Sequence, residues 1–329
     1  MRRLGFNTLS AVLVGDGPAL ERALRQFEMN QGWGYRVVGV LGGRKGRGAP
    51  AYRRLGSLVD LPQVLKNHVV DLVVVCPSPK APLRKVLELA GPVGVAVFEL
   101  VPEDLAALGP ELDQLGDLRA FHYDPQRSQP YARLTKGIFD VFVALVLLIL
   151  LAPVFLALAV AIGITMGRPI FFMQKRLGRN GRVFRLFKFR TMVIDARARQ
   201  AALAEKNVMG GPVFKVKNDP RVTSLGRFLR VTSLDELPQL LNVVRGELSL
   251  VGPRPLPTYE ARKVPAWAWR RYSVKPGITC TWQVSGRSNI SFEKWMRMDL
   301  DYIDHWSFGG DLGLLIRTLP AVLASRGAY

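Results

Sequence analysis

The sequence predicts an α/β protein in two parts, with a doubly wound N-terminal domain followed by a mainly helical domain that begins with a membrane-inserted segment. Three observations lead to this prediction. Residues 8–123 alternate short apolar runs with helical patterns, residues 138–164 form one long apolar stretch, and most of the net charge of +20 falls after residue 130. We place the N-terminal domain at residues 1–125, a linker at 126–137, the membrane-inserted helix at 138–165 and the second domain at 166–329.

The apolar runs of the N-terminal domain have the length and composition of buried strands. They are NTLSAVLVG (7–15), YRVVGVLG (35–42), DLVVVC (71–76) and VGVAVFEL (93–100). Helical patterns separate them at 18–30, 58–68 and 81–90. Because strands that alternate with helices form parallel sheets, this domain is predicted to be Rossmann-like.

The first predicted strand runs into VGDGPAL, which resembles part of the glycine-rich fingerprint of dinucleotide-binding domains. Gly15 and Gly17 match the fingerprint, but Leu20 stands at the third glycine, and no acidic residue follows the second strand to hold a ribose. The pattern therefore favours a structural or regulatory module over a site for NAD. Self-association into a homodimer through this domain is a further hypothesis.

Residues 121–137 are polar and contain prolines, which predicts a linker. The apolar stretch that follows has 27 residues and a single charge, Asp140, so it is apolar enough to enter a bilayer. Pro153 near its middle breaks the backbone hydrogen-bond ladder of a helix. A simple spanning helix and a buried core helix are the alternatives to a helix that turns back at this proline.

Both flanks of the apolar stretch are basic. Arg133 and Lys136 precede it, and eight Lys and Arg residues with no acid follow it between residues 168 and 190. Since basic flanks stay on the cytoplasmic side, we expect both ends on that face and a re-entrant helix between them. Residues 131–329 hold 30 Lys and Arg against 13 Asp and Glu, which indicates an anionic partner such as anionic lipid, nucleic acid or a phosphorylated substrate.

The cysteines and histidines argue against a zinc site and against a disulfide framework. Cys76 and Cys280 are far apart, and neither they nor the three histidines have metal-ligand spacing. This usage fits a reducing compartment, and residues 1–30 do not show the pattern of a secretory signal.

The segment TSLDELPQLLN (232–242) places two carboxylates, Asp235 and Glu236, side by side. Ser233 with Glu236 matches a capping box, so a helix cap is the first interpretation. Pro238 weakens it, because a proline past the first turn of a helix is costly. We expect instead a turn over 233–237 and a helix that restarts near Pro238, with both carboxylates at its entrance.

Other segments of the second domain are rich in Arg, Pro and aromatic residues. FFMQKRLGRNGRVFRLFKFRTM (171–192) suits single-stranded nucleic acid, but directly after an apolar stretch it fits a membrane interface better. SLVGPRP (249–255) fixes Arg254 between two prolines, as suits phosphate binding. VKPGITCTWQVSGRSN (274–289) predicts a loop at a nucleotide site or a hairpin, and Trp267 and Trp269 predict interfacial anchors or core packing.

Three of these segments closely resemble ordered motifs of the bacterial sugar transferases, the monotopic polyprenyl-phosphate hexose-1-phosphate transferases. They are KFRTM (188–192), NDPRVTSLGRFLRVTSLDELPQLLNVVRGELSLVGPRP (218–255) and KPGITCTWQVSGR (275–287). The resemblance covers roughly residues 133–329, and the N-terminal domain looks like that of the undecaprenyl-phosphate galactose phosphotransferase branch. Cys280 replaces a usual Gly, Lys275 a usual Arg, and Ala152 the usual Ser before Pro153.

The resemblance implies a phosphoglycosyl transferase domain that moves galactose- or glucose-1-phosphate from a UDP-sugar to undecaprenyl phosphate and releases UMP. It implies that Asp235 is the nucleophile of a covalent phosphosugar intermediate and that Glu236, together with Asp235, holds Mg²⁺. The substrate-binding candidates that it suggests are Arg190, Arg230, Arg254, Pro255, Arg287, Asp299 and Asp311. For the last two, an ordinary charge on a helix surface is the alternative.

The implied location is the bacterial cytoplasmic (inner) membrane, with the catalytic domain on the cytoplasmic face, at the first membrane step of exopolysaccharide or O-antigen synthesis. A membrane-tethered nucleotide-binding scaffold or sensor without turnover is the alternative function, but it leaves the paired carboxylates and GPRP unexplained. A nucleic-acid binder explains the charge but not the apolar stretch, so no nucleic acid is expected as a partner.

Overall fold

The computed structural model describes residues 9–30, 34–43, 52–79, 81–101, 113–115, 118–123, 130–199, 202, 213, 216, 218–285 and 290–323. Its contacts divide the chain into two compact units. The N-terminal unit comprises Met1–Ser128 and Pro265–Ser273, and the C-terminal unit comprises Gln129–Val264 and Val274–Tyr329.

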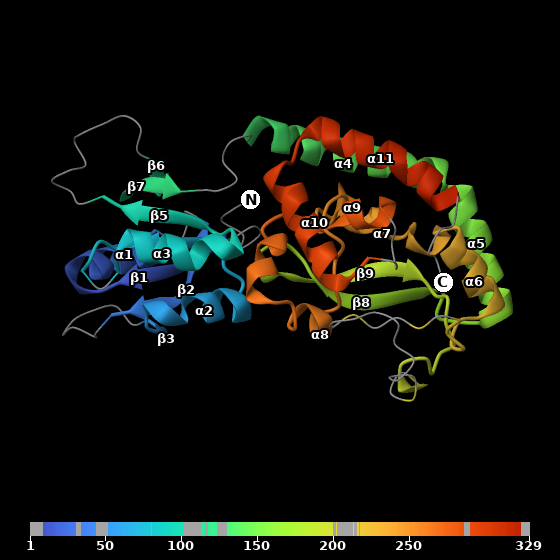
Figure 1. Ribbon diagram of the computed structural model, residues 1–329, viewed down its shortest axis with the longest axis horizontal. Coiled ribbons are helices and arrows are strands. Elements are labelled where there is room, and N and C mark those ends of the chain that lie inside the picture. The colour runs from blue at the N-terminus through green and yellow to red at the C-terminus, as the bar shows by residue number, and fades with distance from the viewer. Residues whose placement is uncertain are drawn as a thin grey trace. The chain divides into compact units, whose positions relative to one another are not determined.

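The N-terminal unit is built on one mixed sheet with helices between its strands (Figure 1). Its elements are β1 (Leu9–Gly15), α1 (Gly17–Met29), β2 (Tyr35–Gly42), β3 (Arg54–Gly56), η3 (Leu58–Asp60), α2 (Leu61–Asn67), β4 (Leu72–Val75), α3 (Leu83–Ala90), η4 (Gly91–Val93), β5 (Ala96–Leu100), β6 (Asp113–Leu115) and β7 (Leu118–Tyr123). The strand order is β3-β2-β1-β4-β5-β7-β6, in which the first five strands are parallel and β7 and β6 are antiparallel. The predicted parallel sheet is confirmed, whereas β3, β6 and β7 were not predicted.

Gly15, one of the two glycines that match the dinucleotide fingerprint, is required by the packing of this sheet. Gly15 ends β1 with φ 144°, and a Cβ there would lie 2.5 Å from the carbonyl oxygen of Cys76, which follows β4. Only glycine therefore lets β1 and β4 approach so closely. Burial raises the pKa of Cys76 to about 12, so this thiol stays neutral and packs as an apolar group.

A short segment from the second half of the sequence belongs to the N-terminal unit. It contains η8 (Ala266–Tyr272), and its Trp269 is buried with the ammonium group of Lys66 5.5 Å from the ring centre. Trp267 is exposed. Of the two interpretations for these tryptophans, core packing therefore holds for Trp269.

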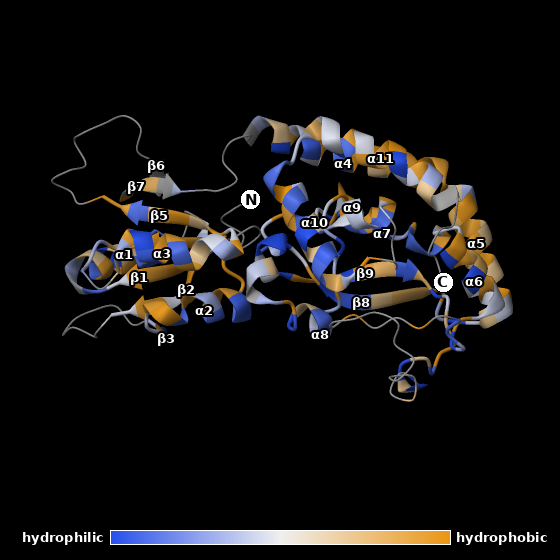
Figure 2. Ribbon diagram, viewed as in Figure 1, coloured by the Kyte–Doolittle hydropathy of each residue, from blue (hydrophilic) through white to orange (hydrophobic). Residues whose placement is uncertain are grey.

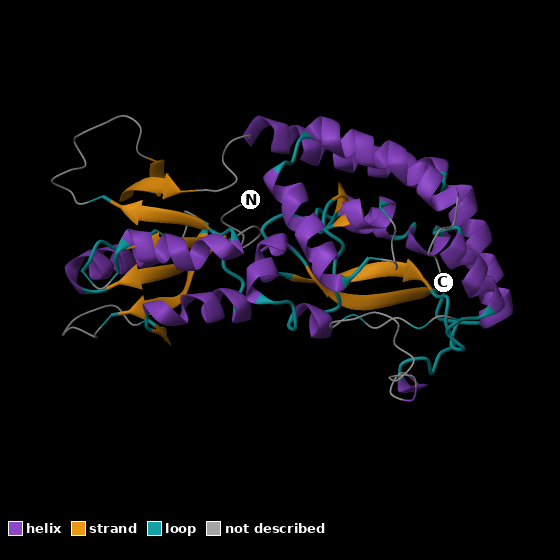
Figure 3. Cartoon of the chain, viewed as in Figure 1, coloured by secondary structure: helices purple, strands orange, loops and turns teal. Residues whose placement is uncertain are grey.

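The C-terminal unit surrounds an antiparallel hairpin with helices (Figure 3). Its helices are α4 (Pro130–Leu150), α5 (Ala152–Met166), α6 (Ser224–Val231), α7 (Gln239–Val244), α8 (Thr258–Ala261), α9 (Thr281–Val284), α10 (Phe292–Asp304) and α11 (Phe308–Leu323), with short turns η5 (Arg179–Gly181) and η7 (Leu234–Glu236). β8 (Phe171–Leu177) and β9 (Val183–Phe189) form the hairpin, and β10 (Ser249–Val251) pairs with β11 (Gly277–Thr279) in parallel.

The apolar stretch forms the bent pair α4–α5. The helix axis bends by 62° between α4 and α5, at Leu151. Pro153 is the second residue of α5, where its missing N–H is tolerated. Among the described residues, no single helix is long and apolar enough to cross a membrane, but this bent pair has the length and composition to do so as a whole. The chain thus bends near the predicted proline.

The polar stretch 121–137 overlaps β7 at one end and α4 at the other, and the linker placed at 126–137 is wrong from Pro130 onward, while 126–129 lie outside the described residues. Residues 121–123 belong to β7, and α4 begins at Pro130 rather than near residue 138. Proline suits the first turn of a helix, and α4 then continues without interruption into the apolar stretch.

One face of the bent pair packs on the rest of the C-terminal unit. Ala144 of α4 is buried with Leu186 of β9 and Leu240 of α7, and Ile162 of α5 is buried with Phe189 of β9. The opposite face exposes large apolar side chains along both helices. The ribbon of the two helices is accordingly orange over much of its length in Figure 2. This packing fixes β9, which ends at the functional site.

Candidate active site

A cavity of about 1010 Å³ opens in the C-terminal unit. The hairpin β8–β9, the residues after β9, η7, residues 254–260, α9 and α10 contribute to its lining. Nine of the lining residues are Lys or Arg and three are Asp or Glu. A concave site with this excess of positive charge suits a ligand that carries several negative charges, such as a diphosphate.

The paired carboxylates lie in a tight turn at the cavity. Ser233 has φ 58°, in the left-handed region, and Leu234–Glu236 form the turn η7. Pro238 then stands directly before α7, so the predicted turn and the helix restart are both confirmed. The capping-box interpretation is wrong, because the side chain of Ser233 makes no capping hydrogen bond. A non-glycine residue in this conformation is strained, as often occurs at functional sites.

Glu236 is held by two cations. Its Oε1 accepts hydrogen bonds from Nη2 of Arg254 at 2.6 Å and from Nζ of Lys188 at 2.7 Å. Burial would raise the pKa of Glu236, but the charges and hydrogen bonds of Arg254 and Lys188 outweigh it and bring the pKa well below its usual range. Glu236 is therefore ionised throughout the neutral range.

Asp235 has a different environment from its neighbour. Its Oδ2 lies 3.5 Å from Nζ of Lys188, and the carboxyl group is buried. Burial and the charge of Glu236 raise its pKa above the usual value, although Lys188, Arg230 and Arg254 oppose them. A carboxylate with a raised pKa and fewer close cations is the more basic and more nucleophilic of the two.

Lys188 was not among the predicted site residues, although it begins the segment KFRTM. The alternation along β9 carries the signal that would have found it. Phe184 and Leu186 are buried side chains of one face, and Lys188 is the next residue of that face. A lysine in the inward register of a strand needs a buried partner, which here is the carboxylate pair.

Arg254 is fixed by its surroundings as well as by its flanking prolines. The amide oxygen of Gln283 accepts a hydrogen bond from Nη1 of Arg254 at 3.0 Å. In this orientation the amide nitrogen of Gln283 donates to the carbonyl of Ile278. Arg176 donates through Nη1 to the carbonyl of Pro255 at 2.8 Å. The predicted Arg254 and Pro255 both line the cavity.

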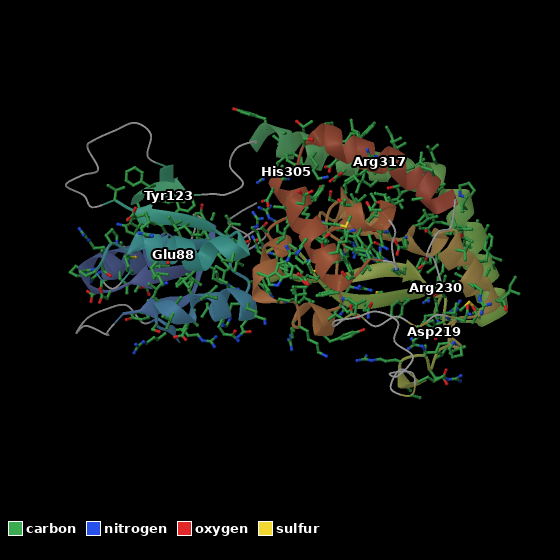
Figure 4. All side chains as sticks on the ribbon, in the orientation of Figure 1. Glu88, Tyr123, Asp219, Arg230, His305 and Arg317 are labelled. Atoms are coloured by element: carbon green, nitrogen blue, oxygen red, sulfur yellow. The ribbon has the colours of Figure 1, made fainter. Side chains whose placement is uncertain are left out.

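Arg230 of α6, labelled in Figure 4, lines the cavity. Gly226 lets α6 pack closely, because a Cβ there would lie 2.0 Å from the carbonyl oxygen of Thr191. Nε of Arg230 then donates to Oγ1 of Thr191 at 3.0 Å. Burial lowers the pKa of Arg230, and the carboxylates of Asp235 and Asp219 oppose this shift. Arg230 is thus a third cation close to Asp235.

Arg190 lines the cavity, but its guanidinium group is occupied elsewhere. Its Nη atoms donate to the backbone carbonyls of Met166, Gly167 and Arg168, at the end of α5. The carbonyl of Met166, the last residue of α5, is one that a helix end leaves unpaired. The structure therefore gives Arg190 a role in fixing the end of the bent helix pair. Arg287 lies outside the described residues.

Asp311 belongs to a second group of buried and half-buried polar side chains, which we call the anchor cluster. It consists of Lys136, Asp140, Ser249, Tyr302, Trp306 and Asp311. Asp311 accepts from Lys136, from Tyr302 at 2.8 Å and from Trp306 at 3.0 Å, while Asp140 accepts from Ser249 at 2.7 Å. None of its members, nor Asp299, is among the described residues that line the cavity.

The carboxylate pair fits Mg²⁺ by its donor type. Among the described residues, no group of three or more His, Cys, Asp and Glu side chains is arranged to hold a metal ion. Mg²⁺ does not require such a group, because it is commonly bound by one or two carboxylates together with substrate phosphates. Asp235 and Glu236 supply two carboxylates at a cavity that is large enough for a nucleotide.

Comparison with known proteins gives consistent matches over the C-terminal unit. A family model described as bacterial sugar transferase matches residues 131–325, which is more than half of the chain. The galactosyl transferase CpsE of Streptococcus agalactiae is 47% identical over 163 residues, 49% of this chain and 36% of that protein. The UDP-galactose-lipid carrier transferase of Erwinia amylovora is 41% identical over 206 residues, 60% of this chain and 42% of that protein.

A third relative is covered over more of its length. The UDP-glucose:undecaprenyl-phosphate glucose-1-phosphate transferase of Caulobacter vibrioides is 40% identical over 205 residues, which are 60% of this chain and 72% of that protein. The chain thus spans less than half of the length of the two relatives named before it.

Proposed function

Because the chain belongs to the bacterial sugar transferase family, we propose that it is a phosphoglycosyl transferase that moves a sugar-1-phosphate from a UDP-sugar to undecaprenyl phosphate and releases UMP. The names of the relatives support a lipid carrier as acceptor and galactose or glucose as the sugar. The observation that carries the proposal is the carboxylate pair with Lys188, Arg230 and Arg254 at a strongly basic cavity.

In the first step, a carboxylate oxygen of Asp235 attacks the phosphorus that carries the sugar. The bond from this phosphorus to the bridging oxygen breaks, UMP leaves with the electron pair, and an aspartyl phosphosugar remains. Asp235 suits this role because Glu236 is ion-paired through Oε1 with both Lys188 and Arg254 and is the weaker base. The three cations near the pair stabilise the charge on the leaving phosphate.

In the second step, a phosphate oxygen of the lipid carrier attacks the same phosphorus and Asp235 is released. Mg²⁺, held by Glu236 and Asp235, is proposed to supply further neutralisation of the phosphate charges. We further propose that the bent pair α4–α5 enters the cytoplasmic leaflet of the bacterial inner membrane and turns back, with the cavity on the cytoplasmic side. The exposed apolar face of the pair and its basic flanks support this location.

The test is UMP release from a panel of UDP-sugars, with and without undecaprenyl phosphate, by the full chain in lipid nanodiscs. Wild-type protein should release UMP with one or more of these sugars and become covalently labelled by a UDP-sugar that carries ³²P next to the sugar. Asp235→Asn should do neither, whereas Asp301→Asn, which changes an exposed acid of α10, should do both. Labelling that persists in Asp235→Asn would refute the assignment of the nucleophile.

A further inference from the structure

Large apolar side chains are exposed at one part of the cavity lining. Phe171, Phe172, Met173 and Ile194 line the cavity and are between 42% and 74% exposed. Three of them are the first residues of β8. Exposed apolar patches of this kind usually mark a binding site for an apolar partner.

We propose that this apolar strip, defined as Phe171, Phe172, Met173 and Ile194, holds the isoprenoid chain of the acceptor next to the carboxylate pair. The proposal rests on the proposed function, since it concerns the lipid carrier of that same reaction. Its occupant is the hydrocarbon chain of a polyprenyl phosphate whose phosphate group is bound by the cations of the cavity.

The register of the hairpin brings the strip to the reacting groups. Phe172 of β8 pairs with Lys188 of β9, and directly opposite residues of a sheet lie on the same face with their Cβ atoms about 5 Å apart. Nζ of Lys188 contacts both Asp235 and Glu236. An acceptor phosphate near Lys188 therefore has the exposed ring of Phe172 as an immediate neighbour for its first isoprene units.

Phe171 and Met173 alternate with Phe172 and lie on the other face of β8, so the strip wraps around the start of this strand and continues to the bent helix pair. β8 begins five residues after α5 ends, the ring of Phe171 stacks on Phe189 at 5.3 Å, and Phe189 contacts Phe155 of α5 at 5.5 Å. The outer face of α5 exposes further apolar residues, among them Leu156 and Ile164. A chain that leaves the strip can therefore follow an apolar surface along α5.

The same strand separates the strip from a polar part of the cavity. On the face that carries Phe172, the next two residues are Gln174 and Arg176, which are joined by a hydrogen bond of 2.6 Å. Tyr259, Glu260 and Gln283 add polar groups to the lining. We assign this polar part to the donor nucleotide, so that Lys188 lies between the seats of donor and acceptor.

The experiment compares Phe172→Ser with Phe228→Ser. Phe228 of α6 is 54% exposed and does not belong to the cavity lining, whereas Phe172 is 46% exposed and does, so the two changes are matched in chemistry and exposure. Each variant is assayed in nanodiscs for covalent labelling without acceptor, and for transfer to undecaprenyl phosphate and to a phosphate with only two isoprene units. Melting temperatures show that both variants fold.

Phe172→Ser should raise the KM for undecaprenyl phosphate roughly tenfold or more, because an exposed serine replaces a large apolar contact. The KM for the short acceptor should change less, and the loss should be confined to the second step. Phe172→Leu, which keeps an apolar side chain, should recover most of the affinity. An equal loss with both acceptors, an equal loss in Phe228→Ser or no loss in Phe172→Ser would each overturn the proposal.

A second measurement separates this inference from the proposed function. A polyprenyl phosphate with a photoreactive diazirine in its chain should crosslink to residues 171–173 or 194 of the wild-type protein, and it needs no turnover. Crosslinking there without UMP release from any UDP-sugar would refute the proposed reaction but keep the strip as a lipid seat. UMP release with crosslinks only to α4 and α5 would refute the strip.

Discussion

Two groups of buried acids in the C-terminal unit resemble each other in composition but differ in use. The site cluster contains Asp235, Glu236 and their cations, and the anchor cluster joins Asp140 and Asp311 to Lys136. Asp235 is 7% exposed and Asp311 3%. Each group also has a lysine that bridges its two acids. Burial and pairing alone therefore do not distinguish a site from a structural network.

The difference lies in the partners of the acids and in access. In the anchor cluster, neutral donors from Ser249, Tyr302 and Trp306 complete the coordination of the carboxylates. In the site cluster, Lys188, Arg230 and Arg254 outnumber the two acids, and all five side chains line a cavity. Excess positive charge at an open cavity is what an anionic ligand requires, whereas acids saturated by neutral donors hold elements together.

The largest expected effect comes from Asp235→Asn, which should reduce UMP release at least about a thousandfold because the proposed nucleophile is lost. The same variant should be more stable than the wild type. Burial raises the pKa of Asp235 above its unfolded value, so its ionised form destabilises the fold as pH rises through the folded pKa. Melting curves should therefore show a gain at pH 7.5 that shrinks toward acid pH. A lower melting temperature at pH 7.5 would contradict this.

The next effect is on stability. Lys136→Met leaves Asp140 and Asp311 buried without their cation and should cost about 3–5 kcal/mol, seen as a fall of roughly 10 °C in the melting temperature in nanodiscs. Lys294→Met, which changes an exposed lysine of α10, is the control. Adding Asp311→Asn to Lys136→Met should recover part of the loss. An unchanged melting temperature would show that the anchor cluster contributes no stability.

A smaller effect is expected from Lys188→Gln. Removing one of the cations that we propose to bind the phosphates should reduce kcat/KM roughly a hundredfold. Lys188 also holds the pKa of Asp235 down against burial, so its loss should raise that pKa and move the acid limb of the pH profile to higher pH. Lys294→Gln should leave the profile unchanged. A uniform loss at all pH values would show that Lys188 binds phosphate without tuning Asp235.

The sequence predicts these clusters unequally, for physical reasons. The turn at Asp235 follows from local information, since Pro238 dictates where α7 restarts. Lys188 could also have been predicted, because it follows Phe184 and Leu186 at alternate positions of β9. The contacts of the anchor cluster cannot be predicted from the sequence, since Lys136 and Asp311 are 175 residues apart and Asp140 and Ser249 are 109 residues apart. Sequence patterns assign Asp311 to the site only by resemblance, and the structure places it away from the cavity lining.

The same distinction holds for the fold. Apolar runs of five to eight residues, such as those of β1 and β2, predict buried strands from the sequence alone. The three-residue strands β3 and β6 carry too little pattern, and β7 lies at the edge of a polar stretch that predicted a linker. The start of α4 at Pro130 was not predicted, because the first turns of this helix are polar and show no helical pattern of apolar residues. Such turns are stabilised by tertiary packing rather than by local sequence.

The smallest effect, from Tyr302→Phe, tests whether the two clusters are independent. The change removes one hydrogen bond to Asp311, which keeps Lys136 and Trp306, so it should cost about 1–2 kcal/mol and a few degrees in the melting temperature. Burial and the charge of Asp311 raise the pKa of Tyr302 far above neutral, so its hydroxyl does not titrate and the loss should be equal at pH 6 and pH 9. UMP release per folded molecule should be unchanged, because Tyr302 does not touch the cavity. An increased KM for either substrate would instead show that the anchor cluster affects substrate binding at the site.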